Sequence, residues 1–215
     1  MLNIDRNNIE IITKQRDSKN QIGREKHELR KTYRSSLFNM IDELDDLSAY
    51  ELGHFINFTD RWLHNRNSNN TTTYRRGDIV FIDLGANNFR FEPSYTHPAI
   101  ILKNSYNSIL IVPCSTKKYG RNLSDVIDAT ASDGFTRDTG IQLGALRWIN
   151  KNRIISNTGK RVSGRILDKI NEKILAYVPT YKRDKRIYEA TKRENEDLKR
   201  ENEDLKLKLE KLNKE

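Results

Sequence analysis

The chain is poor in cysteine and in long apolar runs, and each shortage removes a class of protein. Its 215 residues include one cysteine, Cys114, which excludes an internal disulfide and a cysteine-rich zinc site. No apolar run approaches the roughly 18 residues that a membrane-spanning helix needs. The N-terminus lacks the basic and then apolar segments that begin a secretory signal peptide. The sequence therefore predicts a cytoplasmic protein that does not engage a membrane.

The charged residues are abundant and unevenly placed. They make up 32% of the chain, against 35% hydrophobic residues, and the net charge is +9. Residues 1–73 carry 11 basic and 11 acidic side chains, whereas residues 74–181 carry 16 and 9. A basic excess on one compact domain favours a polyanionic partner such as nucleic acid, through phosphate neutralisation and counterion release. Solubility alone is the simpler explanation.

The N-terminal part, residues 1–72, is predicted to be a helical extension. Residues 24–66 contain no proline and one glycine, and Ser48 or Asp46 is expected to cap a second helix, with Glu51 as the partner of Ser48 in a capping box. The first 20 residues are polar and are expected to be loose. The helix period appears in the apolar residues Leu29, Tyr33, Leu37, Met40, Ile41, Leu44 and Leu47.

The C-terminal part, residues 182–215, contains the repeat RENEDLK twice, at 193–199 and 200–206. Leu198, Leu205 and Leu212 recur every seven residues as d positions, and the a positions include Asn195 and Asn202. This pattern predicts a coiled-coil tail, and buried asparagine at a positions favours two parallel strands. About three heptads make a marginal zipper, so a second dimer contact is expected. A single solvated helix remains the alternative.

The middle part, residues 74–180, is predicted to be an α+β domain. Short apolar runs at 79–84, 99–102, 109–112 and 140–149, and a weaker one at 125–131, are typical of strands between turns. Apolar residues at helical spacing follow at 166–175. Five or more short strands and one helix predict a small, closed or half-closed β-barrel with a packed C-terminal helix.

Polar side chains stand at the outer ends of the hairpin formed by residues 99–102 and 109–112. His97 precedes the first strand, and Ser115 and Thr116 follow the second. Because a hairpin brings its outer ends together, we expect these side chains to be neighbours. The residues expected to join them are Glu92, Lys117, Lys118 and Arg147, the last from late in the strand at 140–149.

These residue types suit cleavage of RNA. The reaction needs a base for the 2′-hydroxyl, an acid for the leaving 5′-oxygen and donors for the phosphate oxygens. Histidine can take either proton role, and Thr and Arg can donate to phosphate. No Asp, Glu or His cluster has metal-ligand spacing, so neither a metal nor another cofactor is expected. Simpler roles remain open: His97 begins a strand, Ser115 and Thr116 end one, and Arg147 pairs with Asp83 or Asp138.

The middle part resembles the MazF/PemK family of toxin endoribonucleases. The similar segments, in order, are RRGDIVFIDLG, HPAIIL, VPCSTKKYG, GFTRDTGIQLGALRWI and SGRILDKINEKI. The resemblance implies a barrel related to SH3 folds, a homodimer, single-stranded RNA as substrate, a 2′,3′-cyclic phosphate product and a protein antitoxin as partner. It covers about half of the chain and neither terminal part.

The family's catalytic threonine matches Thr116, and a family glutamate matches Glu92. The family arginine before the strand proline is replaced here by His97. A histidine would serve as a proton shuttle and make activity depend on pH around 6 to 7, or the replacement abolishes cleavage. The residues expected to bind RNA are Ser115, Lys117, Lys118, Arg147, Arg76 and Tyr95.

Two other functions stay open at this point. The first is a non-catalytic nucleic-acid-binding or regulatory protein that keeps the barrel and has lost cleavage. The second is a DNA-gyrase poison on the same barrel, which Thr116 and Glu92 argue against.

Overall fold

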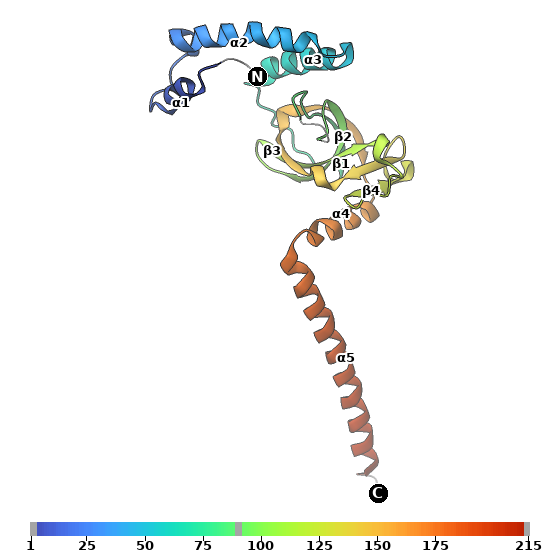
Figure 1. The fold of residues 1–215 in the computed structure, drawn as a ribbon. Coiled ribbons are helices and arrows are strands. Elements are labelled where there is room, and N and C mark those ends of the chain that lie inside the picture. The colour runs from blue at the N-terminus through green and yellow to red at the C-terminus, as the bar shows by residue number, and fades with distance from the viewer. Residues whose placement is uncertain (1–3, 89–91, 213–215) are drawn as a thin grey trace. The chain divides into compact units, whose positions relative to one another are not determined.

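The computed structural model describes residues 4–88 and 92–212, and Figure 1 traces their elements. The chain divides into two compact units, one of residues 1–68 and 85–89 and the other of residues 69–84 and 90–215. Helices and antiparallel strands are both present, as the sequence predicts, with the strands confined to the second unit. No helix in the described ranges is long and apolar enough to cross a bilayer.

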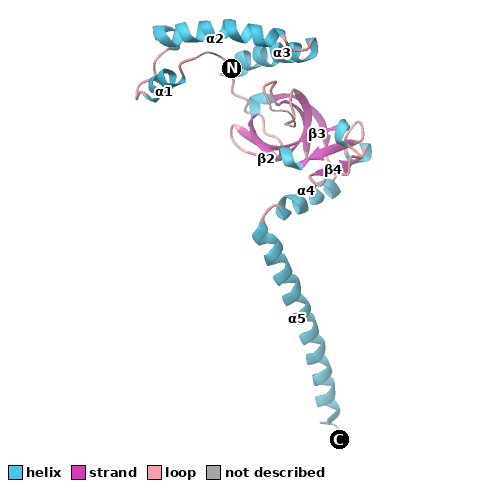
Figure 2. Cartoon of the chain, viewed as in Figure 1, coloured by secondary structure: helices cyan, strands magenta, loops and turns pink. Residues whose placement is uncertain are grey.

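The first unit is helical, as Figure 2 shows. Its elements are α1 (Arg6–Lys14), the 3-10 turn η1 (Gly23–Glu25), α2 (His27–Asp45) and α3 (Ala49–Asn65). The predicted capping box is confirmed: Ser48 Oγ accepts from the Glu51 amide, and the Glu51 carboxylate accepts from the Ser48 amide. Hydrogen bonds from Ser48 lower the pKa of Glu51. Within the segment expected to be loose, residues 6–14 form α1, and Asp5 caps this helix by accepting from the Asn8 amide.

The second unit is built on one antiparallel sheet. Its strand order is β4-β5-β3-β2-β1-β7, and β6 also pairs with β3. The predicted hairpin is present, with Ala99 opposite Pro113 and Ile101 opposite Ile111. The strands are β1 (Asp78–Asp83), β2 (Thr96–Asn104), β3 (Ser108–Ser115), β4 (Val126–Ala129), β5 (Thr139–Gln142), β6 (Arg147–Asn150) and β7 (Ile154–Arg161).

The segment predicted as one strand at 140–149 is two strands, which corrects the sequence prediction. A 3-10 turn, Leu143–Ala145, separates β5 from β6. Both strands follow the same edge of β3, with Gly140 opposite Ser115 and Arg147 opposite Ile111. The residues of this turn lie between the two segments that pair with β3. The turn is held near Asp125, whose carbonyl accepts from the Leu143 amide at 2.8 Å.

The central strands bury both of their faces. On one face, Ile100 and Val112 join a cluster that includes Ile166 and Ile170 of α4 (Gly164–Ala176). On the other face, alternate residues of β1, β2 and β3 form a second cluster with Tyr74 and Ile149. Successive side chains point to opposite faces of a strand, so two buried faces require the continuous apolar runs seen in the sequence.

A polar junction fixes the start of α4. Ser163 caps the helix and donates to Asp133 at 2.8 Å, and Arg165 donates to both Asp133 carboxylate oxygens at 2.8 and 2.7 Å. Burial raises the pKa of Asp133, but the hydrogen bonds from Arg165, Ser163 and Thr130 outweigh it and lower the pKa to about 2. The carboxylate therefore stays ionised while it joins the β4–β5 connection to α4.

The segment before β1 is anchored to the turn η5 (Lys151–Arg153). Lys151 is buried, and its ammonium donates to the Thr72 carbonyl at 3.0 Å. Asn70 donates from its side chain to the Lys151 carbonyl at 3.1 Å. These contacts attach the predicted polar linker to the second unit before its first strand begins.

After α4 the chain continues into α5 (Pro179–Leu212), a helix of 34 residues. It covers most of the segment that the heptad pattern predicts as helical. Leu198, Leu205 and Leu209 are exposed on it. The side chain of Leu212, the third predicted d position, lies outside the described side chains.

Replacing Asp133 by Asn is expected to lower the free energy of unfolding by about 2 kcal/mol at neutral pH, because charge-assisted hydrogen bonds are lost. The folded pKa of Asp133 is about 2, below the ordinary 3.8. The stabilisation is therefore present above the ordinary value and is lost as pH falls through the folded value. Denaturant unfolding from neutral pH to about pH 2 measures both. Asp168→Asn, on the exposed face of α4, is the control; an equal loss in it would contradict the prediction.

Replacing Ser48 by Ala is expected to destabilise the first turn of α3 by about 1 kcal/mol, because the Glu51 amide loses its acceptor. Hydrogen exchange at the Glu51 amide should then be about fivefold faster. Ser35→Ala, at an exposed position inside α2, removes the same hydroxyl away from a helix end. Unchanged exchange in Ser48→Ala would show that the cap does not limit opening of this turn.

Candidate functional site

The site begins where β2 and β3 have their outer ends. His97, the second residue of β2, lies opposite Ile82 of β1. Its Nδ1 atom lies 3.0 Å from the Cys114 carbonyl oxygen on β3. Cys114 directly precedes Ser115, the last residue of β3, and Thr116 follows. The hairpin therefore brings the imidazole against β3 close to its last residue, Ser115, and to Thr116, which follows it.

This contact determines which imidazole nitrogen can react. A carbonyl oxygen only accepts hydrogen bonds, so His97 Nδ1 carries the proton and donates it to Cys114. In the neutral ring, Nε2 then keeps its lone pair and can act as a base. In the protonated ring, Nε2 is a second donor and can act as an acid. The ring is half-buried, so the contact orients it within the protein.

The chain turns sharply after β3. Thr116–Lys118 form the 3-10 turn η2, which is closed by the Tyr119 amide donating to the Thr116 carbonyl at 3.3 Å. This turn lies directly over Gly140 of β5, where an added Cβ would come within 2.7 Å of the Lys118 backbone. Glycine at this position lets η2 lie against the sheet. The side chains of Thr116 and Lys117 are exposed, and that of Lys118 is half-buried.

Two carboxylates hold the residues that follow η2. Both oxygens of Asp128 accept from the Gly120 amide, each at 3.1 Å. Asp138 raises the pKa of Tyr119 by its negative charge and by accepting a hydrogen bond from the phenol. The residues that follow the cationic turn η2 are therefore held by two acidic residues, Asp128 on β4 and Asp138 just before β5.

Glu92 and Tyr95 lie in the connection between β1 and β2. Glu92 is exposed, and its backbone carbonyl accepts from the Ser94 hydroxyl at 3.3 Å. Tyr95 has a left-handed backbone, with φ at 67°, and its carbonyl accepts from the Leu84 amide at 2.9 Å. That hydrogen bond closes the connection just before His97. No contact within the described residues joins the Glu92 side chain to His97 or Thr116.

Arg76 and Arg147 are positioned away from His97. Arg76 donates to the Leu102 carbonyl at 3.2 Å and to Asn171 of α4, and Leu102 is about 16 Å further along β2 than His97. Arg147 donates to the Ala145 carbonyl at 3.3 Å. It lies opposite Ile111, about 13 Å along β3 from Ser115. The structure therefore does not bring these two cations to the ends of β2 and β3.

Arg153 is a cation that the sequence analysis missed. It ends η5, and its guanidinium donates to the Asp83 carbonyl at 3.1 Å. Asp83 lies opposite Thr96, the neighbour of His97. A guanidinium therefore lies at the end of the sheet where β2 begins. A sequence signal for it does exist. Arg153 stands directly before the apolar pair Ile154–Ile155, which begins β7, a strand that the sequence analysis did not predict.

Two further observations concern the chemistry of the site. Burial raises the pKa of the Cys114 thiol far above its usual range, so this cysteine beside the site is a neutral part of the core. Within the described ranges, no group of three or more His, Cys, Asp or Glu side chains is arranged to hold a metal ion.

Comparison with known proteins connects this geometry to a family. No curated protein sequence matches the chain. Residues 75–178 match the family model described as PemK-like, MazF-like toxin of type II toxin-antitoxin system. The match includes β1 to β7, α4 and the site at the ends of β2 and β3. Over this segment, just under half of its length, the chain is therefore similar to the PemK-like, MazF-like toxins of type II toxin–antitoxin systems.

Proposed function

We propose that this protein is a metal-independent endoribonuclease toxin that cleaves single-stranded RNA at the ends of β2 and β3. One observation carries the proposal: the His97 imidazole donates to the Cys114 carbonyl, two residues before Thr116. It supports a site that combines a proton-transfer group with a hydroxyl donor. Members of the matched family are generally endoribonucleases, which gives this site its expected reaction.

The reaction assigns a role to each group. The RNA 2′-oxygen attacks the adjacent phosphorus, the bond from phosphorus to the 5′-oxygen breaks, and a 2′,3′-cyclic phosphate and a 5′-hydroxyl result. One proton leaves the attacking 2′-oxygen and another is added to the leaving 5′-oxygen. His97 Nε2 carries out one of these two transfers and Glu92 carries out the other. Thr116 donates to a non-bridging phosphate oxygen. The nucleophile belongs to the substrate, so the protein supplies only proton transfer and charge.

Binding of the RNA is assigned to the residues around this centre. Lys117 and Lys118 on η2 neutralise phosphates, Ser115 adds a hydroxyl, and Tyr95 offers a ring for an unstacked base. Arg76 and Arg147 remain candidates only for RNA that extends along the sheet, because their guanidinium groups bond to backbone carbonyls elsewhere. The 2′-hydroxyl is itself the nucleophile, so DNA is not a substrate.

The proposal includes the family's architecture and its partner. A small closed barrel of the SH3 type is part of the proposal, and the apolar cluster formed by alternate residues of β1, β2 and β3 would be its interior. Similarity to the toxin family supports a cognate antitoxin that covers the RNA site.

Replacement of the family arginine by His97 favours one alternative function. An arginine stays protonated and acts by charge, whereas a histidine can exchange its proton. If the site needs a permanent charge, the protein binds nucleic acid or regulates without cleaving. Binding of RNA without any cleavage product would identify this alternative.

His97→Ala and Thr116→Ala are each expected to reduce kcat on single-stranded RNA by about 10²- to 10⁴-fold, because proton transfer or a phosphate donor is lost. The assay is run with EDTA present, and the products are mapped by primer extension and tested for a 2′,3′-cyclic phosphate. His27→Ala and Thr73→Ala, at exposed positions, are matched controls. Cleavage by His97→Ala at the wild-type rate would remove this residue from the mechanism.

We also propose that α5 joins two chains in a parallel coiled coil. Leu198 and Leu205 are about half exposed, at 50% and 51%. Both occupy d positions of the heptad pattern, where a second helix would bury them. Leu207, also exposed at 56%, falls at an f position on the outer side.

Replacing Leu198 and Leu205 together by Lys is expected to raise the dimer dissociation constant by at least about tenfold, since two apolar pairs become repulsive. Sedimentation equilibrium of the full chain measures it. Leu207→Lys makes the same substitution on the outer side and should leave the constant unchanged. A wild-type chain that is monomeric at micromolar concentration, or an equal effect of Leu207→Lys, would reject the coiled coil.

A further inference from the structure

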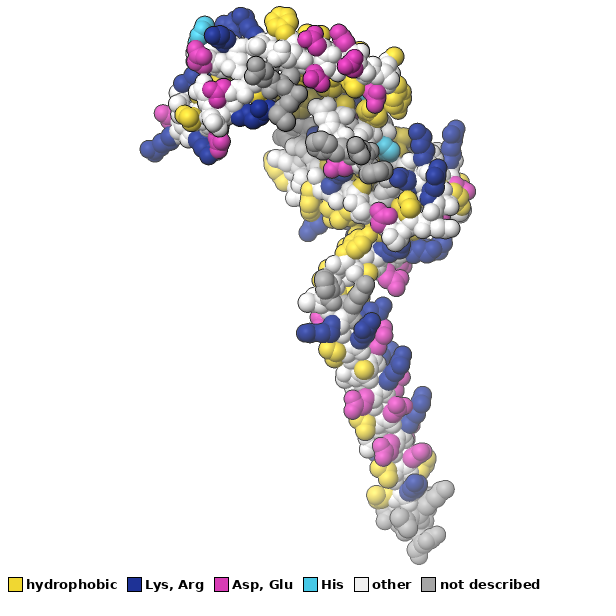
Figure 3. Space-filling view, viewed as in Figure 1, with side chains coloured by type: hydrophobic (Ala, Val, Ile, Leu, Met, Phe, Trp, Pro, Cys, Tyr) yellow, Lys and Arg dark blue, Asp and Glu magenta, His cyan; other side chains and the backbone are white. Residues whose placement is uncertain are grey.

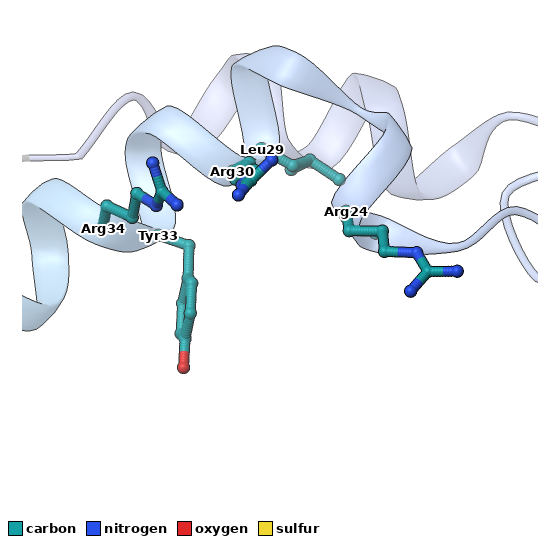
Figure 4. Close-up of a pocket in the computed structure, with 6 residues that line it drawn as sticks. Arg24, Leu29, Arg30, Tyr33 and Arg34 are labelled. Atoms are coloured by element: carbon teal, nitrogen blue, oxygen red, sulfur yellow. The ribbon is translucent and has the colours of Figure 1, made fainter.

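The helical first unit contains a pocket that the proposed reaction does not use. It lies where η1 meets α2 and has a volume of about 470 Å³. Figure 4 shows Tyr33 and Arg24 extending to the same side of the helix. This volume falls in the range of small-molecule sites, roughly 300 to 1,000 Å³. The lining residues are Gly23, Arg24, Leu29, Arg30, Tyr33 and Arg34.

The three arginines of this pocket are uncompensated. All are exposed, and the described part of the chain gives none of their guanidinium groups an ion pair or a hydrogen bond. Arg30 and Arg34 are four residues apart on α2, where like charges repel. A bound anion would relieve this repulsion, so the arrangement is complementary to phosphate.

The charge of the surrounding sequence points the same way. Residues 14–34 carry eight Lys and Arg against three Asp and Glu, whereas residues 35–60 carry six Asp and Glu and no Lys or Arg. Figure 3 shows acidic side chains gathered along the later part of α2. The balanced total charge of this unit therefore conceals a basic region and an acidic region.

The start of α2 adds to the positive potential of the pocket. The N-cap residue Lys26 makes no side-chain capping hydrogen bond, so the first amides of the helix keep their hydrogens available. The helix dipole places partial positive charge at this end. Glu28 in the first turn opposes part of it.

Tyr33 indicates which polyanion the pocket suits. Its side chain is 62% exposed, and it lies between Arg30 and Arg34 along the helix. Aromatic rings beside guanidinium groups bind single-stranded nucleic acid, because bases stack on the ring while phosphates pair with arginine. An acidic peptide would use the arginines but not the ring face.

We propose that the pocket formed by Arg24, Arg30, Tyr33 and Arg34 is an auxiliary binding site for single-stranded RNA. It rests on the proposed function, in that the RNA bound is the substrate outside its cleavage point. Two or three phosphates pair with the arginines, and one base stacks on Tyr33. The extension would then raise affinity for long RNA without taking part in proton transfer.

The test measures binding of the full chain carrying Thr116→Ala to a labelled single-stranded RNA, by fluorescence anisotropy over a series of salt concentrations. The site variant adds Arg24→Gln, Arg30→Gln and Arg34→Gln. The matched control adds Arg186→Gln, Arg193→Gln and Arg200→Gln, three exposed arginines at f positions of α5. Both variants lose the same net charge. The site variant should bind about tenfold more weakly, and its slope of log affinity against log salt should fall by about 2.

The control should bind like the parent, and Tyr33→Ala should weaken binding with little change in the salt slope. Equal effects of the site and control variants would overturn the auxiliary site. So would displacement of the RNA by poly-glutamate as efficiently as by unlabelled RNA of equal charge, which would indicate a protein partner.

Cleavage by chains that keep Thr116 separates the two proposals. If the wild type cleaves and the site variant binds RNA like the control, only the auxiliary site fails. If the site variant loses affinity but no chain cleaves, the auxiliary site stands and the nuclease proposal fails.

Discussion

Burial of both faces of the central strands is the constraint on which the second unit depends. Residues of β2 and β3 alternate between two apolar clusters, so no position along the middle of either strand can carry a polar side chain without cost. Functional groups are therefore restricted to the strand ends. His97 and Thr116 occupy two such ends, and the short hairpin turn makes these ends adjacent. The site is a consequence of how the core is packed.

The same constraint explains what the sequence could predict. Continuous apolar runs identified the hairpin, and the order of polar residues around it placed His97 against the end of β3. Ser48 and Glu51 predicted the start of α3 because a capping box is a local interaction. Local patterns of this kind are readable because the residues involved are within a few positions of one another.

Features that depend on distant residues were not predictable. The turn between β5 and β6 is fixed by Asp125, which lies about twenty positions upstream and gives no signal in the apolar pattern. Arg76 and Arg147 have the right charge, but strand register carries them to other parts of the sheet. Arg153 reaches the site end only because β7 pairs with β1. In the first unit, the balanced total charge concealed the separation of basic side chains at residues 14–34 from acidic side chains at residues 35–60.

The single cysteine has a practical consequence. Cys114 lies in the apolar core beside the site, and burial keeps its thiol protonated, so alkylating reagents that need a thiolate find almost none in the native chain. A cysteine introduced on the surface would be the one position that such a reagent modifies. Fluorophores or spin labels can therefore be attached to either unit without first removing the native sulfur.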